Sequence, residues 1–89
     1  MLSISANNEI IKYCRVFDWT EYNQEHEENK NVAIIVIDAN IGYNVFRDGK
    51  YMEIIDWFEE LEDAIECAVE RAFFEHSKHE VQEQKGNNE

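Results

Sequence analysis

Proline is absent from the 89-residue chain, and glycine and cysteine are scarce, at three and two residues. The three glycines stand far apart, so they form no glycine-rich loop of the kind that cradles phosphate. The longest purely apolar run, Val32 to Ile37, has six residues and is far too short to span a bilayer. The absence of proline leaves nothing to interrupt a long helix.

Cysteine occurs only at Cys14 and Cys67. A secreted domain of this size usually carries more cysteines for disulfides, so we expect a protein of the reducing cytoplasm. Neither residue lies in a Cys-x-x-Cys motif, which favours structural thiols, although a Cys14–Cys67 bridge stays open. The N-terminal Met-Leu-Ser-Ile-Ser lacks the basic region and the long apolar run of a signal peptide.

Basic residues are also few, with 8 Lys and Arg against 20 Asp and Glu, a net charge of −12 and a pI near 4.5. This charge excludes direct binding to nucleic acid or to an anionic membrane surface. Hydrophobic residues make up 44% of the chain, which is enough for a packed core. The length allows one small domain, expected over residues 1–81.

The first two thirds of the chain predict three or four strands. Residues 10–19 are dense in β-branched and aromatic side chains, which favours a strand. A helix stays the alternative there, because charged residues recur every three positions. Residues 20–31 are typical of a polar, acidic loop. The aliphatic run Val32–Ile37 predicts a central strand covered on both faces, and residues 38–42 predict a turn.

A hairpin is expected at Asp48-Gly49, which separates the strand-like runs Tyr43–Arg47 and Lys50–Ile55. An Asp-Gly pair in this setting is typical of a two-residue turn in which both residues have positive φ. This hairpin would place two strands side by side immediately before the last third of the chain.

One long helix is expected from about residue 58 to 79. Asp56 and Glu59 have the spacing of a capping box, and a stripe at helical spacing predicts the buried face. The stripe consists of Phe58, Leu61, Ile65, Ala68, Ala72 and His76. The fold expected is therefore α+β, an antiparallel sheet of three to four strands packed by one long C-terminal helix, with residues 82–89 as a disordered tail.

The acidic residues are concentrated on this helix. Glu59 to Glu70 contain six carboxylates and no base, which is half of the net charge. Carboxylates four residues apart rise about 6 Å along a helix axis, which resembles the charge spacing that DNA presents to a basic groove. Adjacent Phe73 and Phe74 cannot both point fully into one core. We therefore expect a partner-binding surface made by Glu59, Glu62, Asp63, Glu66, Glu70 and Phe74.

Catalytic and metal-binding patterns are weak. The serines lie in no nucleophile motif, and an all-acidic helix face does not give two carboxylates contrasting environments. His76 and His79 could supply two metal ligands, but zinc needs four. The sequence therefore predicts a protein that is not an enzyme and has no catalytic residues, metal or cofactor.

The short strands around Asp48-Gly49 and the run Glu59-Glu60-Leu61-Glu62-Asp63-Ala64-Ile65-Glu66 carry a resemblance. In size, charge and layout the chain resembles the small acidic inhibitors that phages use against bacterial defence nucleases, the anti-CRISPR and anti-restriction proteins. The resemblance implies a protein target in the host cytoplasm, such as a CRISPR effector complex, bound at its DNA- or guide-facing groove. DNA mimicry stays a separate hypothesis, because some of these inhibitors block assembly or dimerise their target.

Two alternatives stay open. The first is an immunity protein or antitoxin that covers the basic active site of a nuclease toxin, which has the same charge logic. The second is a structural or oligomerising module that uses exposed sheet edges and the Phe74 side of the helix. The chain itself is expected to be a monomer or a homodimer.

Overall fold

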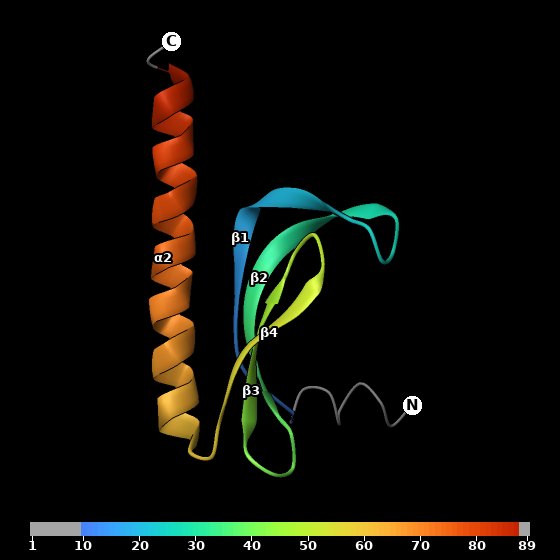
Figure 1. The fold of residues 1–89 in the computed structure, drawn as a ribbon, viewed down its shortest axis with the longest axis vertical. Helices are drawn as coiled ribbons and strands as arrows, with labels where there is room; N and C mark the ends of the chain where they lie inside the picture. Colours follow the sequence, from blue (N-terminus) through green and yellow to red (C-terminus); the bar gives the residue numbers. More distant parts are fainter. Residues whose placement is uncertain (1–9, 88–89) are drawn as a thin grey trace.

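The computed structural model describes the backbone of residues 10–87 and the side chains of residues 10–80. Four strands, β1 (Ile11–Asn23), β2 (Glu28–Asp38), β3 (Tyr43–Asp48) and β4 (Met52–Phe58), precede one helix, α2 (Leu61–Asn87) (Figure 1). The strands lie in the order β1-β2-β3-β4, each antiparallel to the next. The predicted α+β fold, with a C-terminal helix packed on an antiparallel sheet, is confirmed.

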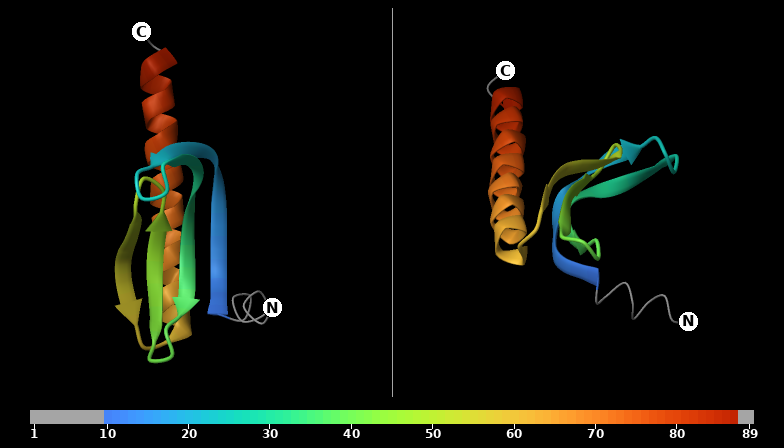
Figure 2. Two further views of the ribbon diagram at one scale, coloured as in Figure 1. Left: turned by 90° about the vertical axis from the view of Figure 1, so that its right-hand side faces the viewer. Right: turned by 60° about the horizontal axis from the view of Figure 1, so that its bottom comes forward.

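The core lies between α2 and one face of the curved sheet (Figure 2). Val32, Ile34 and Val36 of β2 are fully buried there, because alternate residues of a strand point to the same face. They pack with Phe17, Val45, Ala64, Ala68 and Ala72. The central position predicted for this strand is confirmed.

The other face of the sheet differs from the prediction that β2 is covered on both sides. Ala33 is buried there, but Ile35 and Ile37 are only half-buried. Elsewhere in the sheet, Val16 of β1 and Ile54 of β4 are each more than 60% exposed. The helix therefore shields one face, and apolar side chains remain accessible on the face turned away from it.

Residues 10–19 form a strand, as favoured, but the predicted loop over 20–31 is wrong. β1 continues to Asn23 and β2 begins at Glu28, so a short turn replaces the loop. The Asn23 carboxamide holds this turn, since its Oδ1 accepts from the His26 amide at 2.9 Å and its Nδ2 donates to the Gly49 carbonyl at 2.7 Å. The Asn23–Gly49 contact joins residues distant in sequence, so local polarity could not indicate it.

Both predicted turns between the later strands exist, but one has a different geometry. At 38–42, Asn40 (φ 74°) and Gly42 (φ 86°) adopt the left-handed conformation. The Asp48-Gly49 hairpin is present, whereas its predicted two-residue turn is wrong: residues 49–51 connect the strands, and neither Asp48 nor Gly49 has positive φ. Close packing instead favours glycine at position 49, because a Cβ there would lie 2.6 Å from Glu21 Oε1, which would have to move.

Helix α2 begins later and ends later than predicted. Asp56 is not its N-cap but a residue of β4, whose carboxylate accepts from the Trp57 amide at 2.7 Å. The backbone of residues 82–87, expected to form a tail, continues the helix. His76, placed in the buried stripe by its spacing, is only half-buried, and Glu75 is buried in its place. Residues 1–9 and 88–89 lie outside the described part of the chain.

Candidate acidic interface on the helix

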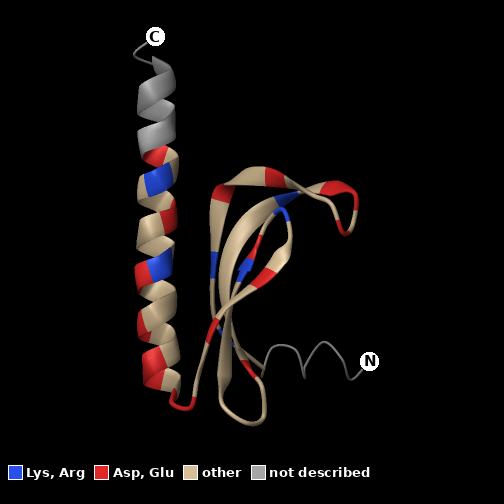
Figure 3. Ribbon diagram, viewed as in Figure 1, with Lys and Arg blue, Asp and Glu red and all other residues tan. Residues whose placement is uncertain are grey.

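The acidic residues predicted to bind a partner are all exposed. Figure 3 shows them along the first half of α2 and at the junction with β4. They are Glu59, Glu62, Asp63, Glu66 and Glu70. Among the side chains of residues 10–80, none of them takes part in an ion pair. The interface predicted from sequence is thus accessible and its carboxylates are not neutralised by neighbours.

These carboxylates fall into two groups on α2. Successive helix residues are about 100° apart, so the four helical carboxylates point away from the buried Ala68, with Glu62 and Glu66 displaced to one side and Asp63 and Glu70 to the other. Glu59 precedes α2 and, with Glu62 and Glu66, is here called the outward row. Asp63 and Glu70 lie on the side nearer β4, where Glu66 borders the same hollow. The predicted surface therefore consists of the outward row and the pair Asp63 and Glu70.

A groove runs between α2 and β4. Its first part, about 440 Å³, is lined by Asp56, Phe58, Asp63, Glu66, Cys67 and Glu70. Its second part, also about 440 Å³, is lined by Ile55, Cys67, Glu70, Arg71, Phe73 and Phe74. Since both parts share Cys67 and Glu70, the groove is continuous, and its character changes from acidic to apolar and basic along α2.

Phe74, the apolar member of the predicted interface, lies in the second part of the groove. Its side chain is 53% exposed, and that of Phe73 is 71% exposed. The guanidinium of Arg71 and the ammonium of Lys78 each lie 5.8 Å from the centroid of the Phe74 ring. The expectation that both phenylalanines cannot enter the core is confirmed, since neither does.

Cys67 lies at the middle of the groove. Burial raises the pKa of its thiol, and the carboxylates of Asp56 and Glu70 raise it further. Burial and then Asp48 likewise raise the pKa of Cys14. Both cysteines are free, so the Cys14–Cys67 bridge left open by the sequence does not form. Both thiols are protonated at neutral pH, which makes them poor nucleophiles.

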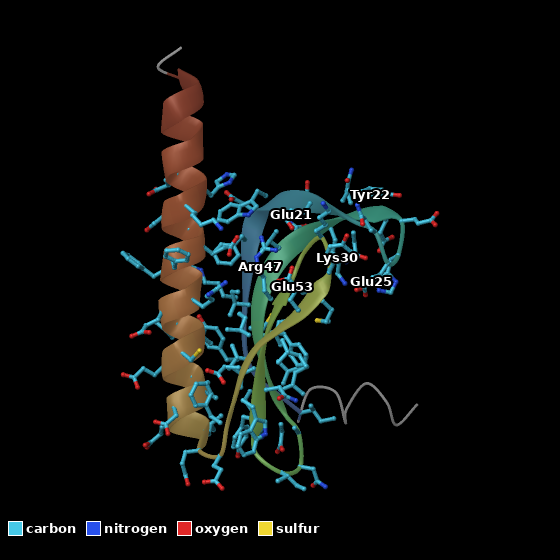
Figure 4. All side chains as sticks on the ribbon, viewed as in Figure 1. Glu21, Tyr22, Glu25, Lys30, Arg47 and Glu53 are labelled. Carbon is cyan, nitrogen blue, oxygen red and sulfur yellow. The ribbon has the colours of Figure 1, made fainter. Side chains whose placement is uncertain are left out.

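A second charged cluster lies between α2 and the sheet, and it was not predicted from the sequence. Arg47 of β3 donates to Glu21 of β1 at 2.7 and 3.1 Å and to Glu75 of α2 at 2.8 and 3.0 Å. Figure 4 shows Arg47 and Glu21 near the upper end of the sheet. Glu21 also accepts from the Lys50 amide at 2.7 Å. One guanidinium thus joins β1, β3 and α2.

The electrostatics of this cluster are those of a paired site. Hydrogen bonds from Arg47 lower the pKa of Glu21, and hydrogen bonds to Glu75 and then Glu21 raise the pKa of Arg47. The adjoining cavity of about 360 Å³ is lined by Trp19, Thr20, Glu21, Arg47, Glu75, Lys78 and His79. We interpret the cluster as a connection between sheet and helix, because the Arg47 guanidinium is hydrogen-bonded to both Glu21 and Glu75.

The histidine pair weighed as metal ligands lies beside Trp19 and makes other contacts. His79 stacks on Trp19 with ring centroids 3.9 Å apart, whereas His76 Nδ1 lies 3.8 Å from a Glu80 carboxylate oxygen. In the described part of the chain, no three His, Cys, Asp or Glu side chains come together as a metal site. No helix within residues 10–87 has the length and apolar character needed to cross a bilayer.

Comparison with known proteins adds no relative. No protein-family model, curated protein sequence or solved structure matches this chain significantly.

Proposed function

We propose that this protein is a small acidic inhibitor that binds a basic nucleic-acid-binding surface of another protein through the outward row Glu59, Glu62 and Glu66. One observation carries the proposal: these carboxylates are exposed, and the described side chains supply no ion-pair partner for them. Like charges at this spacing cost a helix a few tenths of a kcal/mol per pair. A basic partner surface would offset that cost on binding.

Steering by charge supports the same assignment. A net charge of −12 on 10.6 kDa attracts a basic surface from a distance and raises its association rate. Val69 and Phe73, exposed by 49% and 71%, lie beside the outward row and can contribute apolar contact. The target class proposed from the sequence resemblance is a defence nuclease complex such as a CRISPR effector, with DNA mimicry as one mode of inhibition.

The proposal is tested by affinity capture with charge-matched variants. The first variant, Glu59→Lys, Glu62→Lys and Glu66→Lys, reverses the outward row and leaves Asp63 and Glu70 unchanged. The control, Asp18→Lys, Glu25→Lys and Glu28→Lys, changes the net charge equally at exposed positions outside α2. Wild type and control should retain the same nucleic-acid-binding protein from host lysate, and duplex DNA should displace it.

The outward-row variant should retain none of this protein although its circular dichroism matches that of wild type. Equal capture by the folded outward-row variant would overturn the proposal, as would a captured protein that duplex DNA does not displace. The control separates loss of one surface from loss of overall charge.

A further inference from the structure

The groove-lining side of α2 carries a pattern with its own symmetry. At about 100° per residue, six positions fall within one sector of roughly 100° that borders β4. They are Asp63, Cys67, Glu70, Arg71, Phe74 and Lys78, here called the groove stripe. In chain order the stripe reads acid, apolar, acid, base, apolar, base.

This order is self-complementary about the midpoint between Glu70 and Arg71. Reversal about that point exchanges Asp63 with Lys78, Cys67 with Phe74, and Glu70 with Arg71. Two identical helices packed antiparallel around a two-fold axis bring such exchanged positions together. Each acid of the stripe then lies level with a base of the other copy, and each apolar side chain with an apolar one, over about 22 Å of helix.

The charges of the groove stripe are not paired within one copy. In the described part of the chain, Asp63, Glu70, Arg71 and Lys78 take part in no ion pair. Arg71 and Lys78 have Cys67 and Phe74 four residues before them, so neither has an acid at that position. Glu75, four residues after Arg71 and three before Lys78, is bound to Arg47. A second copy would supply the missing partners.

We propose that a second copy of this chain occupies the groove, with its α2 packed antiparallel on the groove stripe. A uniformly basic segment fits only the first half of the groove, because Arg71 lines the second half and the Lys78 ammonium lies 5.8 Å from the centroid of the Phe74 ring there. Strand addition is disfavoured at the same edge, since the register shifts around Val45 and Phe46 leave Ile55 as a bulge in β4. Glu59 and Glu62 of the outward row line neither part of the groove and stay exposed in this dimer.

Two variants with opposite stripes test the proposal. The basic-stripe variant combines Asp63→Lys with Glu70→Arg, and the acidic-stripe variant combines Arg71→Glu with Lys78→Glu. Each variant places like charges opposite one another in its own dimer, whereas a mixed dimer pairs opposite charges at every position. A control, Glu25→Lys with Glu28→Lys, has the same net charge as the basic-stripe variant but an unchanged stripe.

Sedimentation equilibrium at fixed salt measures the mass of each sample. Wild type and control should approach twice the 10.6 kDa monomer mass as concentration rises. Each stripe variant alone should dimerise about tenfold or more weakly, and the equimolar mixture should recover the dimer. A monomeric wild type, or a mixture with no more dimer than its components, overturns the proposal. Recovery in the mixture also shows that the variants are folded.

Discussion

Helix α2 carries two sets of charged residues, one buried and paired with the sheet and one exposed. On the side facing the sheet, Glu75 is 6% exposed and shares Arg47 with Glu21. On the side bordering β4, Asp63, Glu70 and Arg71 are exposed and take part in no ion pair among the described side chains. The difference indicates that the first set stabilises the monomer and that the second set is available for binding.

The largest effect should follow from removing the shared base. Arg47→Met leaves Glu75 buried without its charge partner, and breaking such a pair costs about 3–5 kcal/mol of unfolding free energy. In a domain of this size that loss corresponds to a Tm lower by roughly 12 °C or more. Arg71→Met is the matched control, and its unfolding free energy should change by about 0.5 kcal/mol or less. Equal urea-unfolding midpoints for Arg47→Met and Arg71→Met would contradict the claim that the charges facing the sheet, and not those bordering β4, stabilise the monomer.

Lowering the pH should destabilise the cluster of Arg47, Glu21 and Glu75, because Glu21 becomes protonated. Because Arg47 lowers the pKa of Glu21 in the folded protein below its ordinary 4.5, Glu21 contributes stability above that pH. This contribution is lost as the pH falls through the lowered pKa. Glu21→Gln should therefore make unfolding free energy less dependent on pH below about pH 4.5. Denaturant titrations from pH 7 to pH 3 measure it, and parallel curves for wild type and variant would count against this role.

A smaller effect is expected at Gly49, where no left-handed backbone is involved. An added Cβ would lie 2.6 Å from Glu21 Oε1 and 2.8 Å from Arg47 Nη1, so these flexible ends must move. Gly49→Ala should cost about 1 kcal/mol, the value of a weakened hydrogen bond. In a Glu21→Ala background the same change should cost less. A double-mutant cycle of thermal unfolding measures this coupling, and strict additivity would contradict it.

The smallest effect concerns the exposed carboxylates. Glu62, Glu66 and Glu70 repel one another at intervals of four residues, so Glu66→Lys should raise stability by a few tenths of a kcal/mol at low salt. High salt should abolish the gain, because ions screen exposed charges within about 10 Å at 0.1 M. Thermal melts at low and high sodium chloride concentration test this. A stability loss in the folded variant would show that Glu66 has a structural role.

The sequence predicted the elements better than their connections. Alternation in β1 and the aliphatic run of β2 indicate strands because burial on one face selects such patterns. The exposed acidic residues of α2 were likewise found from their spacing. By contrast, the turn at Asn23 and the position of Gly49 depend on contacts between distant segments, which no local pattern encodes.

The paired cluster was missed for the same reason, since it needs the register of β1, β3 and α2 together. A signal was nevertheless present: Ala64, Ala68, Ala72 and Glu75 share one face, so the spacing placed a carboxylate on the buried stripe. A buried carboxylate requires a charged or hydrogen-bonding partner, and Arg47 supplies it. The groove between α2 and β4 could not be predicted either, because it depends on the position of β4 beside the helix.

The central claim, that the unpaired side of α2 binds a second copy, is tested most directly by disulfide formation in a Cys14→Ser background. Within one chain, residues 67 and 74 are about 10 Å apart along the helix, too far for a disulfide. Phe74→Cys should therefore form a covalent dimer with Cys67 of the second copy, whereas Val69→Cys, exposed but outside the groove, should not. Equal cross-linking of the two variants under mild oxidation, or none in either, would contradict the account.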